Sequence, residues 1–266
     1  MSEYNIKLSI IILNYNTPKL VKYLLTNFFD LKKNFSYEVI VINNGEKTKF
    51  LEEIRAFRNS IKVREIPNHG YAAGNNTGMR AASGEYVMIM NPDLYWHDGE
   101  IEKMIDYLDQ HTEVGILGPK LIYPSQEVQY SCLRYPDWHL PFYRRSKLSQ
   151  TTRAQKWLDH YLLKDYNHQT ARAVDWLFGA CLLVRQRAIA QVGLLDEQYF
   201  MYFEDLDWCR RFNNASWQVH YLPTAQVIHF HHRDSADKIG FFGFFTKLGR
   251  IHFYSWLKYL RKWNFS

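Results

Sequence analysis

The stretch EYVMIMNPDLYWHD, residues 85–98, starts as an apolar run and ends in a polar turn. Its residues 86–90 have the composition of a buried strand, and Pro92 ends that strand. Asp93 is therefore left just beyond the carboxyl end, close to Asn91. A carboxylate beside a second oxygen ligand can hold Mg²⁺ or Mn²⁺. The same tripeptide is also ordinary turn chemistry, so both interpretations stay open.

Similar apolar runs precede this one and alternate with helical patterns. Continuous apolar strands between helices predict an α/β protein with a parallel sheet covered on both faces. In such a sheet ligands bind beyond the carboxyl ends of the strands. Those ends carry the polar sequences NYN, NNG, NHG and NPD. We predict strands at 8–13, 37–42, 60–66 and 86–90, and helices at 18–28, 49–58, 71–82 and 101–111.

The composition narrows the class of partner without identifying it. The formal charge of +6 indicates an anionic partner such as a phosphate, a nucleic acid or an acidic membrane. Three widely spaced cysteines without a C-x-x-C pair argue against a disulfide framework or a zinc site and favour a reducing cytosol. Because no stretch of about 18 apolar residues occurs, we expect no membrane-spanning helix. We also expect no signal peptide.

The glycine and asparagine segment at 68–84 follows the third predicted strand. Gly70, Gly74 and Gly78 recur every fourth residue, which matches neither G-x-G-x-x-G nor a P-loop. Close backbone approach at a helix start, with Asn75 and Asn76 as donors, suits a nucleotide sugar. Small residues that pack a helix against the sheet are the alternative.

Acidic side chains gather near a helix start in FEDLDWCRR, residues 203–211. Acids at this position are favoured by the helix dipole, but capping needs only one or two of them. Glu204, Asp205 and Asp207 therefore leave a carboxylate that can act as general base toward a hydroxyl group.

Three histidines follow in VIHFHHRDS, residues 227–235. In a strand, alternation places His229 and His231 on one face and His232 on the other. Such a cluster can ligate a metal. Between these motifs, residues 121–174 show no regular pattern, residues 176–184 read as a strand or strand pair, and residues 195–212 end in a helix.

The order of these motifs resembles the family-2 inverting glycosyltransferases of the GT-A fold, and within them the bacterial rhamnosyltransferase group. The resemblance runs from about Leu8 to Ser235 and rests on six motifs in order. It implies a Rossmann-like, mixed, mostly parallel sheet flanked by helices. It also implies a domain at 1–238, with a nucleotide-sugar-binding half at 1–120 and an acceptor-binding half at 121–238.

The resemblance further implies transfer of a sugar from a nucleotide donor to an acceptor hydroxyl with inversion, assisted by Mg²⁺ or Mn²⁺. Asp93, His229 and Asn91 would hold the metal, with His231 as the competitor of His229, and Asp205 would be the base. Asn43 stands where the family usually has Asp, which alters the expected base contact. The nucleotide sugar would contact Asn14, Asn16, Asn43, Asn44, Asn68, Gly74, Asn75 and Asn76, and the acceptor Trp176, Gly179, Ala180 and Glu204.

The group resemblance favours dTDP-rhamnose as donor, followed by UDP-sugars including galactofuranose. The acceptor would be a glycan or a polyprenyl-linked glycan in bacterial surface polysaccharide synthesis. A nucleotidyltransferase would be expected to carry a basic glycine-rich loop after the first strand, and NYNTPK shows none. A degenerate scaffold is disfavoured by the retained acids. We expect no nucleic-acid partner, because the basic residues concentrate in an aromatic tail.

That C-terminal tail, residues 239–266, reads as an amphipathic helix at 240–263. One face would be basic, and the opposite face aromatic. Such a helix either lies at an anionic membrane surface or packs on the enzyme's own core. Lipid-linked acceptors favour peripheral attachment to the cytoplasmic face of the bacterial inner membrane. The aromatic face would contain Phe241, Phe245, Leu248, Trp256, Tyr259, Leu260 and Trp263, and the basic face Lys247, Arg250, Lys258 and Arg261.

Overall fold

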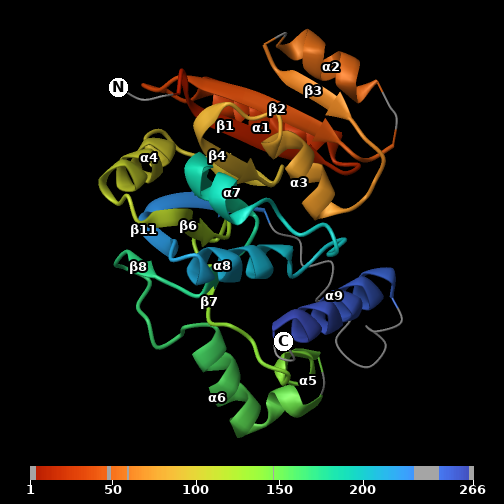
Figure 1. Ribbon diagram of the computed structural model, residues 1–266, viewed down its shortest axis with the longest axis vertical. Helices are drawn as coiled ribbons and strands as arrows, with labels where there is room; N and C mark the ends of the chain where they lie inside the picture. The colour runs from red at the N-terminus through yellow and green to blue at the C-terminus, as the bar shows by residue number, and fades with distance from the viewer. Residues whose placement is uncertain (1–3, 47–48, 59, 146, 231–245, 264–266) are drawn as a thin grey trace.

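A central twisted sheet organises the protein, seen in a computed structural model that describes residues 4–46, 49–58, 60–145, 147–230 and 246–263 (Figure 1). Its neighbouring strands run, in spatial order, as β3 (Lys62–Glu65), β2 (Tyr37–Asn43), β1 (Ile6–Asn14), β4 (Gly84–Met90), β10 (Cys181–Arg185), β6 (Val114–Ile122), β11 (Gln218–His229) and β5 (Leu94–Trp96).

The sheet is mixed but mostly parallel, as the sequence predicted. Strands β3, β2, β1 and β4 are parallel neighbours, and β6 is parallel to β11. Strand β10 lies between β4 and β6 and is antiparallel to both. Strand β5 is antiparallel to β11. The carboxyl ends of β1, β2 and β4 consequently meet at one edge of the sheet.

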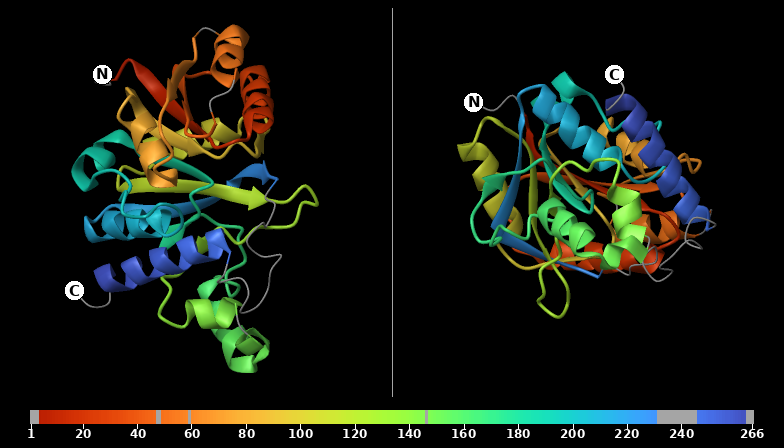
Figure 2. Two further views of the ribbon diagram at one scale, coloured as in Figure 1. Left: turned by 90° about the vertical axis from the view of Figure 1, so that its right-hand side faces the viewer. Right: turned by 90° about the horizontal axis from the view of Figure 1, so that it is seen from below.

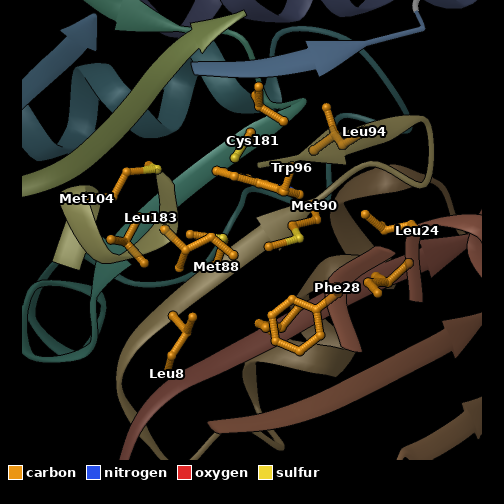
Figure 3. Close-up of a cluster of buried hydrophobic side chains, with 14 of the residues drawn as sticks. Leu8, Leu24, Phe28, Met88, Met90, Leu94, Trp96, Met104, Cys181 and Leu183 are labelled. Atoms are coloured by element: carbon orange, nitrogen blue, oxygen red, sulfur yellow. The ribbon is translucent and has the colours of Figure 1, made fainter. Parts of the chain in front are cut away.

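Helices cover both faces of this sheet. On one face, the cores of β1 and β4 pack against α1 (Pro18–Asp30), α2 (Phe50–Phe57) and α4 (Glu100–Gln110). Figure 3 shows part of this cluster, including Phe28, Met88 and Trp96. The opposite face packs against α3 (Tyr71–Met79), α7 (Gln186–Val192) and α8 (Glu204–Asn214). Pro18 occupies the first turn of α1, where a missing N–H costs nothing.

Several elements depart from the predicted pattern. Residues 176–184 form two strands in different sheets, because β9 (Trp176–Leu177) pairs with β7 (Cys132–Leu133) while β10 enters the main sheet. The predicted boundary at residue 120 falls inside β6. The segment predicted to be irregular contains α5 (Leu140–Arg145), a 3₁₀ turn (Lys147–Gln150), α6 (Thr152–Tyr161) and β8 (Arg172–Ala173).

The tail forms α9 (Lys247–Trp263), which packs on the enzyme's own body (Figure 2). Trp256, Tyr259 and Leu260, from the predicted aromatic face, are buried in the same cluster as the core residues of α8. The Trp263 indole N–H donates to Asp207 Oδ1 at 2.8 Å. The sequence left open whether this face contacts a membrane or packs on the core, and in the structure these residues pack on the core. Phe241 and Phe245, also predicted on this face, lie outside the described residues. None of the described helices is long and apolar enough to span a bilayer.

Candidate active site

Asp93 and His229 come together at one end of the sheet. Asp93 directly precedes β5, and His229 ends β11, opposite Leu94 in the antiparallel pair. The Phe230 N–H donates to the Asp93 carbonyl at 2.9 Å, which fixes the two backbones. His229 Nε2 lies 3.4 Å from Asp93 Oδ2. The structure thus brings together two of the three predicted metal ligands, and places Asn91 two residues before Asp93.

A third side chain, Gln129, orients the imidazole of His229. Gln129 Nε2 donates to the His229 carbonyl at 2.9 Å, so its amide oxygen must face His229 Nδ1, at 2.8 Å. An amide oxygen only accepts, so Nδ1 carries a proton, and Nε2 is the ring nitrogen that faces Asp93. Gln129 lies where the outer hydrogen-bond partner of a metal-ligating histidine would lie.

The residues at this position fit a hard divalent cation. His229 Nε2 and an Asp93 carboxylate oxygen face each other, and a cation between them would bind the carboxylate and the lone pair of the imidazole in its neutral form. Within the described ranges no cluster of three or more His, Cys, Asp and Glu side chains forms a complete protein cage. Mg²⁺ and Mn²⁺ suit this donor set, because Mg²⁺ is commonly held by one or two carboxylates together with substrate phosphates and waters.

Asp205 lies at the start of α8, on a turn of unusual backbone conformation. Tyr202 and Phe203 both adopt positive φ, 69° and 72°, which costs free energy for residues with side chains. This turn directs the Asp205 carboxylate to the segment that enters β10, where Oδ2 accepts the Gly179 N–H at 2.8 Å. Its other oxygen accepts the Leu206 N–H at 2.8 Å.

Glu204 and Asp205 form a coupled pair of carboxyl groups. Burial, followed by the charge of Asp205, raises the pKa of Glu204 well above its ordinary range. Burial also raises the pKa of Asp205, while the N–H donors of Gly179 and Leu206 oppose that shift by stabilising the carboxylate. Of the pair, Asp205 is therefore the carboxyl group that loses its proton more readily.

Tyr71, at the start of α3, lies between these two groups of residues. Its hydroxyl donates to the Gly179 carbonyl at 2.7 Å and lies 3.3 Å from Asn91 Oδ1. The Asn91 N–H donates to the Ala180 carbonyl at 2.8 Å. The strand end that carries Asp93 and the turn that carries Asp205 are therefore joined through residues 179–180.

A cleft of about 550 Å³ opens beside the ends of β1 and β2. Asn16, Asn44 and Asn68 line it, as the predicted nucleotide contacts would. Asn44 is 3% exposed, and its Oδ1 has no hydrogen-bond partner among the described residues. A larger hollow of about 620 Å³ lies between α1 and α2, away from these strand ends.

Asn14 and Asn43 form the floor beneath this cleft. Both are buried, and Asn14 Nδ2 donates to Asn43 Oδ1 at 2.7 Å. Asn43 Nδ2 in turn donates to the Glu46 carbonyl at 3.3 Å. A carboxylate at position 43 could not make the second bond, which gives the departure from the family's Asp a structural reason.

Some predicted contacts have structural roles instead. Asn76 is buried and binds the backbone of Leu195 through both ends of its amide, at 2.8 and 3.0 Å. At Gly74, a Cβ atom would lie 2.5 Å from the Leu13 side chain, so the glycine serves helix packing. Trp176 is buried, and its indole N–H donates to the Arg134 carbonyl at 2.9 Å. The structure thus places these three in the scaffold, while Asn75, also buried, donates to the Tyr71 carbonyl.

Sequence reasoning missed two residues of this site. Gln129 lies in a stretch without periodicity, and nothing local to it signals an approach to β11. Tyr71 does carry a signal, since it is a hydroxyl-bearing aromatic residue at the start of the glycine and asparagine helix. His231, the predicted competitor of His229, lies outside the described residues.

Solved structures share this fold at low sequence identity. The mannosyltransferase PcManGT from Pyrobaculum calidifontis, in complex with GDP-Man and Mn²⁺, aligns with a TM-score of 0.58, 15% identity, and coverage of 88% of this chain and 59% of that one. GalNAc-T7 with UDP, GalNAc and Mn²⁺ aligns with a TM-score of 0.65, 11% identity, and coverage of 86% and 44%. These likenesses confirm the expected GT-A glycosyltransferase fold.

The family is equally clear from the sequence. The model of glycosyl transferase family 2 matches residues 9–189, and the chain belongs to this family. The rhamnosyltransferase WbbL of Escherichia coli (strain K12) is 23% identical over 95% of this chain and 92% of its own length. An N-acetylglucosaminyl-diphospho-decaprenol L-rhamnosyltransferase of Mycobacterium tuberculosis is 34% identical over 54% of this chain. That match spans about half of the mycobacterial protein, 47%.

Proposed function

We propose that this protein is an inverting, metal-dependent glycosyltransferase that acts in bacterial surface polysaccharide synthesis. L-Rhamnose from dTDP-rhamnose is the first candidate for the transferred sugar, because proteins named rhamnosyltransferases are among its relatives. UDP-sugars, including UDP-galactofuranose, come next. The acceptor is a hydroxyl of a glycan or of a lipid-linked glycan, since the mycobacterial relative is named for a decaprenol-linked substrate.

One observation carries the proposal: an oriented Asp93–His229 pair and a separate carboxylate, Asp205, are tied to the same short segment of chain. Gly179 donates its N–H to Asp205, and Ala180 accepts the N–H of Asn91 at the strand end that leads to Asp93. Sugar transfer from a nucleoside diphosphate requires two separate groups: a base that takes the proton of the acceptor, and a site that binds the diphosphate.

In the reaction, Asp205 accepts the proton of the acceptor hydroxyl as that oxygen attacks the anomeric carbon. The bond between the anomeric carbon and the diphosphate oxygen breaks, and the electron pair leaves with the nucleoside diphosphate. Attack opposite the leaving group inverts the configuration. A divalent cation held by Asp93, His229 and Asn91 would supply positive charge to the departing diphosphate. Asp205 suits the role of base because it loses its proton more readily than Glu204.

The first experiment measures donor binding by calorimetry and thermal shift. Purified protein is titrated with dTDP-rhamnose, UDP-sugars and GDP-mannose, each with and without Mn²⁺. We expect metal-dependent stabilisation by one donor, its loss in Asp93→Ala, and its retention in Asp106→Ala, an exposed carboxylate on α4. If no donor binds under any metal condition, the catalytic proposal is wrong.

A second variant separates binding from chemistry. Asp205→Asn keeps the size of the side chain but removes the base. We expect it to bind the donor as the unaltered protein does and to lose roughly 10²–10⁴-fold in kcat. Turnover at the original rate by Asp205→Asn would assign the base to another residue.

We further propose that the solvent-facing side of α9 contacts an anionic membrane surface, in place of the aromatic face expected from the sequence. Tyr254 and Leu257 are 61% and 41% exposed on this side. Arg250 and Arg261 are exposed at helical spacing from them and add positive charge. Exposed apolar side chains between basic ones suit the boundary of an anionic bilayer.

Flotation with liposomes of anionic and of neutral lipid tests this contact. The double variant Tyr254→Ser/Leu257→Ser should float less with anionic liposomes than the unaltered protein. Its matched control is Leu20→Ser/Tyr23→Ser, because that pair on α1 has the same spacing and exposures of 38% and 49%. Equal flotation of all three proteins would remove this face of α9 from the membrane contact.

A further inference from the structure

The backbone N–H and the backbone carbonyl of Tyr71 are both hydrogen-bonded. Its N–H donates to the Phe200 carbonyl at 2.7 Å, and its own carbonyl accepts Asn75 Nδ2 at 3.0 Å. The preceding Gly70 has φ of +99°, and a Cβ atom there would lie 2.0 Å from the Phe200 oxygen. Glycine at position 70 thus allows the backbone of Tyr71 to lie close to the loop before α8.

The Tyr71 hydroxyl has more neighbours than a single proton can serve. A phenol donates one hydrogen bond, and the 2.7 Å contact with the Gly179 carbonyl takes it. Asn91 Oδ1, at 3.3 Å, is the more distant of the two acceptors. The hydroxyl therefore binds Gly179 and lies beside the strand end that leads to Asp93.

Gly179 is bound through both of its backbone polar groups. Its carbonyl accepts from Tyr71, while its N–H donates to Asp205 Oδ2 at 2.8 Å. A side chain at this position would crowd Asp205, because a Cβ atom would lie 3.3 Å from Asp205 Cβ, whereas its distance of 3.5 Å from the Tyr71 hydroxyl is ordinary contact. The carbonyl and the N–H belong to adjacent peptide units, so the bond from Tyr71 acts by position: it holds Gly179 where its N–H reaches Asp205.

We propose that Tyr71 is a positioning residue that holds the Gly179 backbone, and with it the Gly179 N–H, against the Asp205 carboxylate. This inference rests on the proposed function. Tyr71 itself exchanges no proton with substrate in this role. Its hydroxyl lies between the diphosphate end of the site and the base end.

Loss of the Tyr71 hydroxyl should shift the pKa of Asp205 in one direction. The groups that face Asp205 are Glu204, Tyr71, Tyr161 and Cys209. In Tyr71→Phe the Gly179 carbonyl loses its donor, so Gly179 is held less firmly and its N–H binds the Asp205 carboxylate less well. The remaining neighbours are unchanged. A weaker hydrogen bond stabilises the carboxylate less, so the pKa of Asp205 rises and the acid limb of the pH profile moves to higher pH.

The test compares Tyr71→Phe with Tyr221→Phe. Tyr221 is fully buried, and its hydroxyl has no hydrogen-bond partner among the described residues, so it controls for the loss of a buried phenol group. We expect Tyr71→Phe to lose on the order of tenfold in kcat, part of the roughly 10²–10⁴-fold that a positioned base contributes. The KM for the donor should change less, and the acid limb should shift upward. Tyr221→Phe should change neither.

A readout without turnover keeps this inference separate from the proposed function. In protein labelled with ¹³C at the Asp carboxyl groups, the Asp205 resonance is assigned by its absence in Asp205→Asn, and its titration is compared between unaltered protein and Tyr71→Phe. An upward shift supports the positioning role even if no donor is accepted. Identical titrations, or an active Tyr71→Phe with unchanged kcat and pH profile, would overturn it.

Discussion

Replacement of Asp207 by alanine should release α9 from the enzyme body. Asp207 is fully buried on α8 and binds three donors. Arg211 Nε lies at 2.9 Å, Lys262 Nζ at 2.9 Å, and the Trp263 indole nitrogen at 2.8 Å. The last two belong to α9. Although Asp207 lies in the same acidic segment as Asp205, its carboxylate thus anchors the tail and takes no part in the site.

The expected loss in the free energy of unfolding depends on the charged groups that lose Asp207 as their partner. Removal of one partner from a buried ion pair typically costs about 3–5 kcal/mol, because the other charge loses its compensation. Arg211 retains bonds to two backbone carbonyls, and Lys262 retains Asp196, so the lower end applies. We expect a loss of about 3 kcal/mol in the free energy of unfolding. For a chain of this size that corresponds to a fall of roughly 6–12 °C in Tm.

Urea unfolding followed by circular dichroism measures this loss. The matched control is Asp159→Ala, whose ion pair with Lys164 at 2.7 Å is about half exposed on both sides and should contribute less than about 1 kcal/mol. If Asp207→Ala unfolded within 1 kcal/mol of the unaltered protein, like the control, the buried contacts between α8 and α9 would not hold the tail, and the reasoning would fail.

Three further predictions concern the site and its supports. In Glu204→Gln, stability should rise relative to the unaltered protein as pH increases from 4 to 8 in urea unfolding, because the raised pKa of Glu204 makes the folded state bind its proton more tightly than the unfolded state, and that advantage is lost as pH rises. In Gln129→Leu, calorimetry with a nucleoside diphosphate should show Mn²⁺ affinity reduced by about 10–100-fold, because His229 loses its orienting partner. Gly70→Ala should cost more stability than Gly99→Ala, since both have positive φ but only Gly70 has a carbonyl oxygen 2.0 Å from the new Cβ atom.

The sequence by itself determined the parallel half of the fold. Strands β1, β2 and β4 are continuous apolar runs, and polar residues stand at the edge of the sheet where their carboxyl ends meet. Burial on both faces requires such runs, so the pattern encodes the strands directly. The order of the motifs then singled out Asp93, His229 and Asp205 as candidate site residues.

Only the tertiary structure decided what those residues contact. The antiparallel entry of β10 between β4 and β6 brings Gly179 to Asp205 and Tyr71, which are distant in sequence. Gln129 reaches His229 from a segment without periodicity. The aromatic face of α9 was visible in the sequence, but its partner was not. Hydrophobic periodicity records which face of an element is buried, whereas the surface that covers this face depends on the packing of the whole chain.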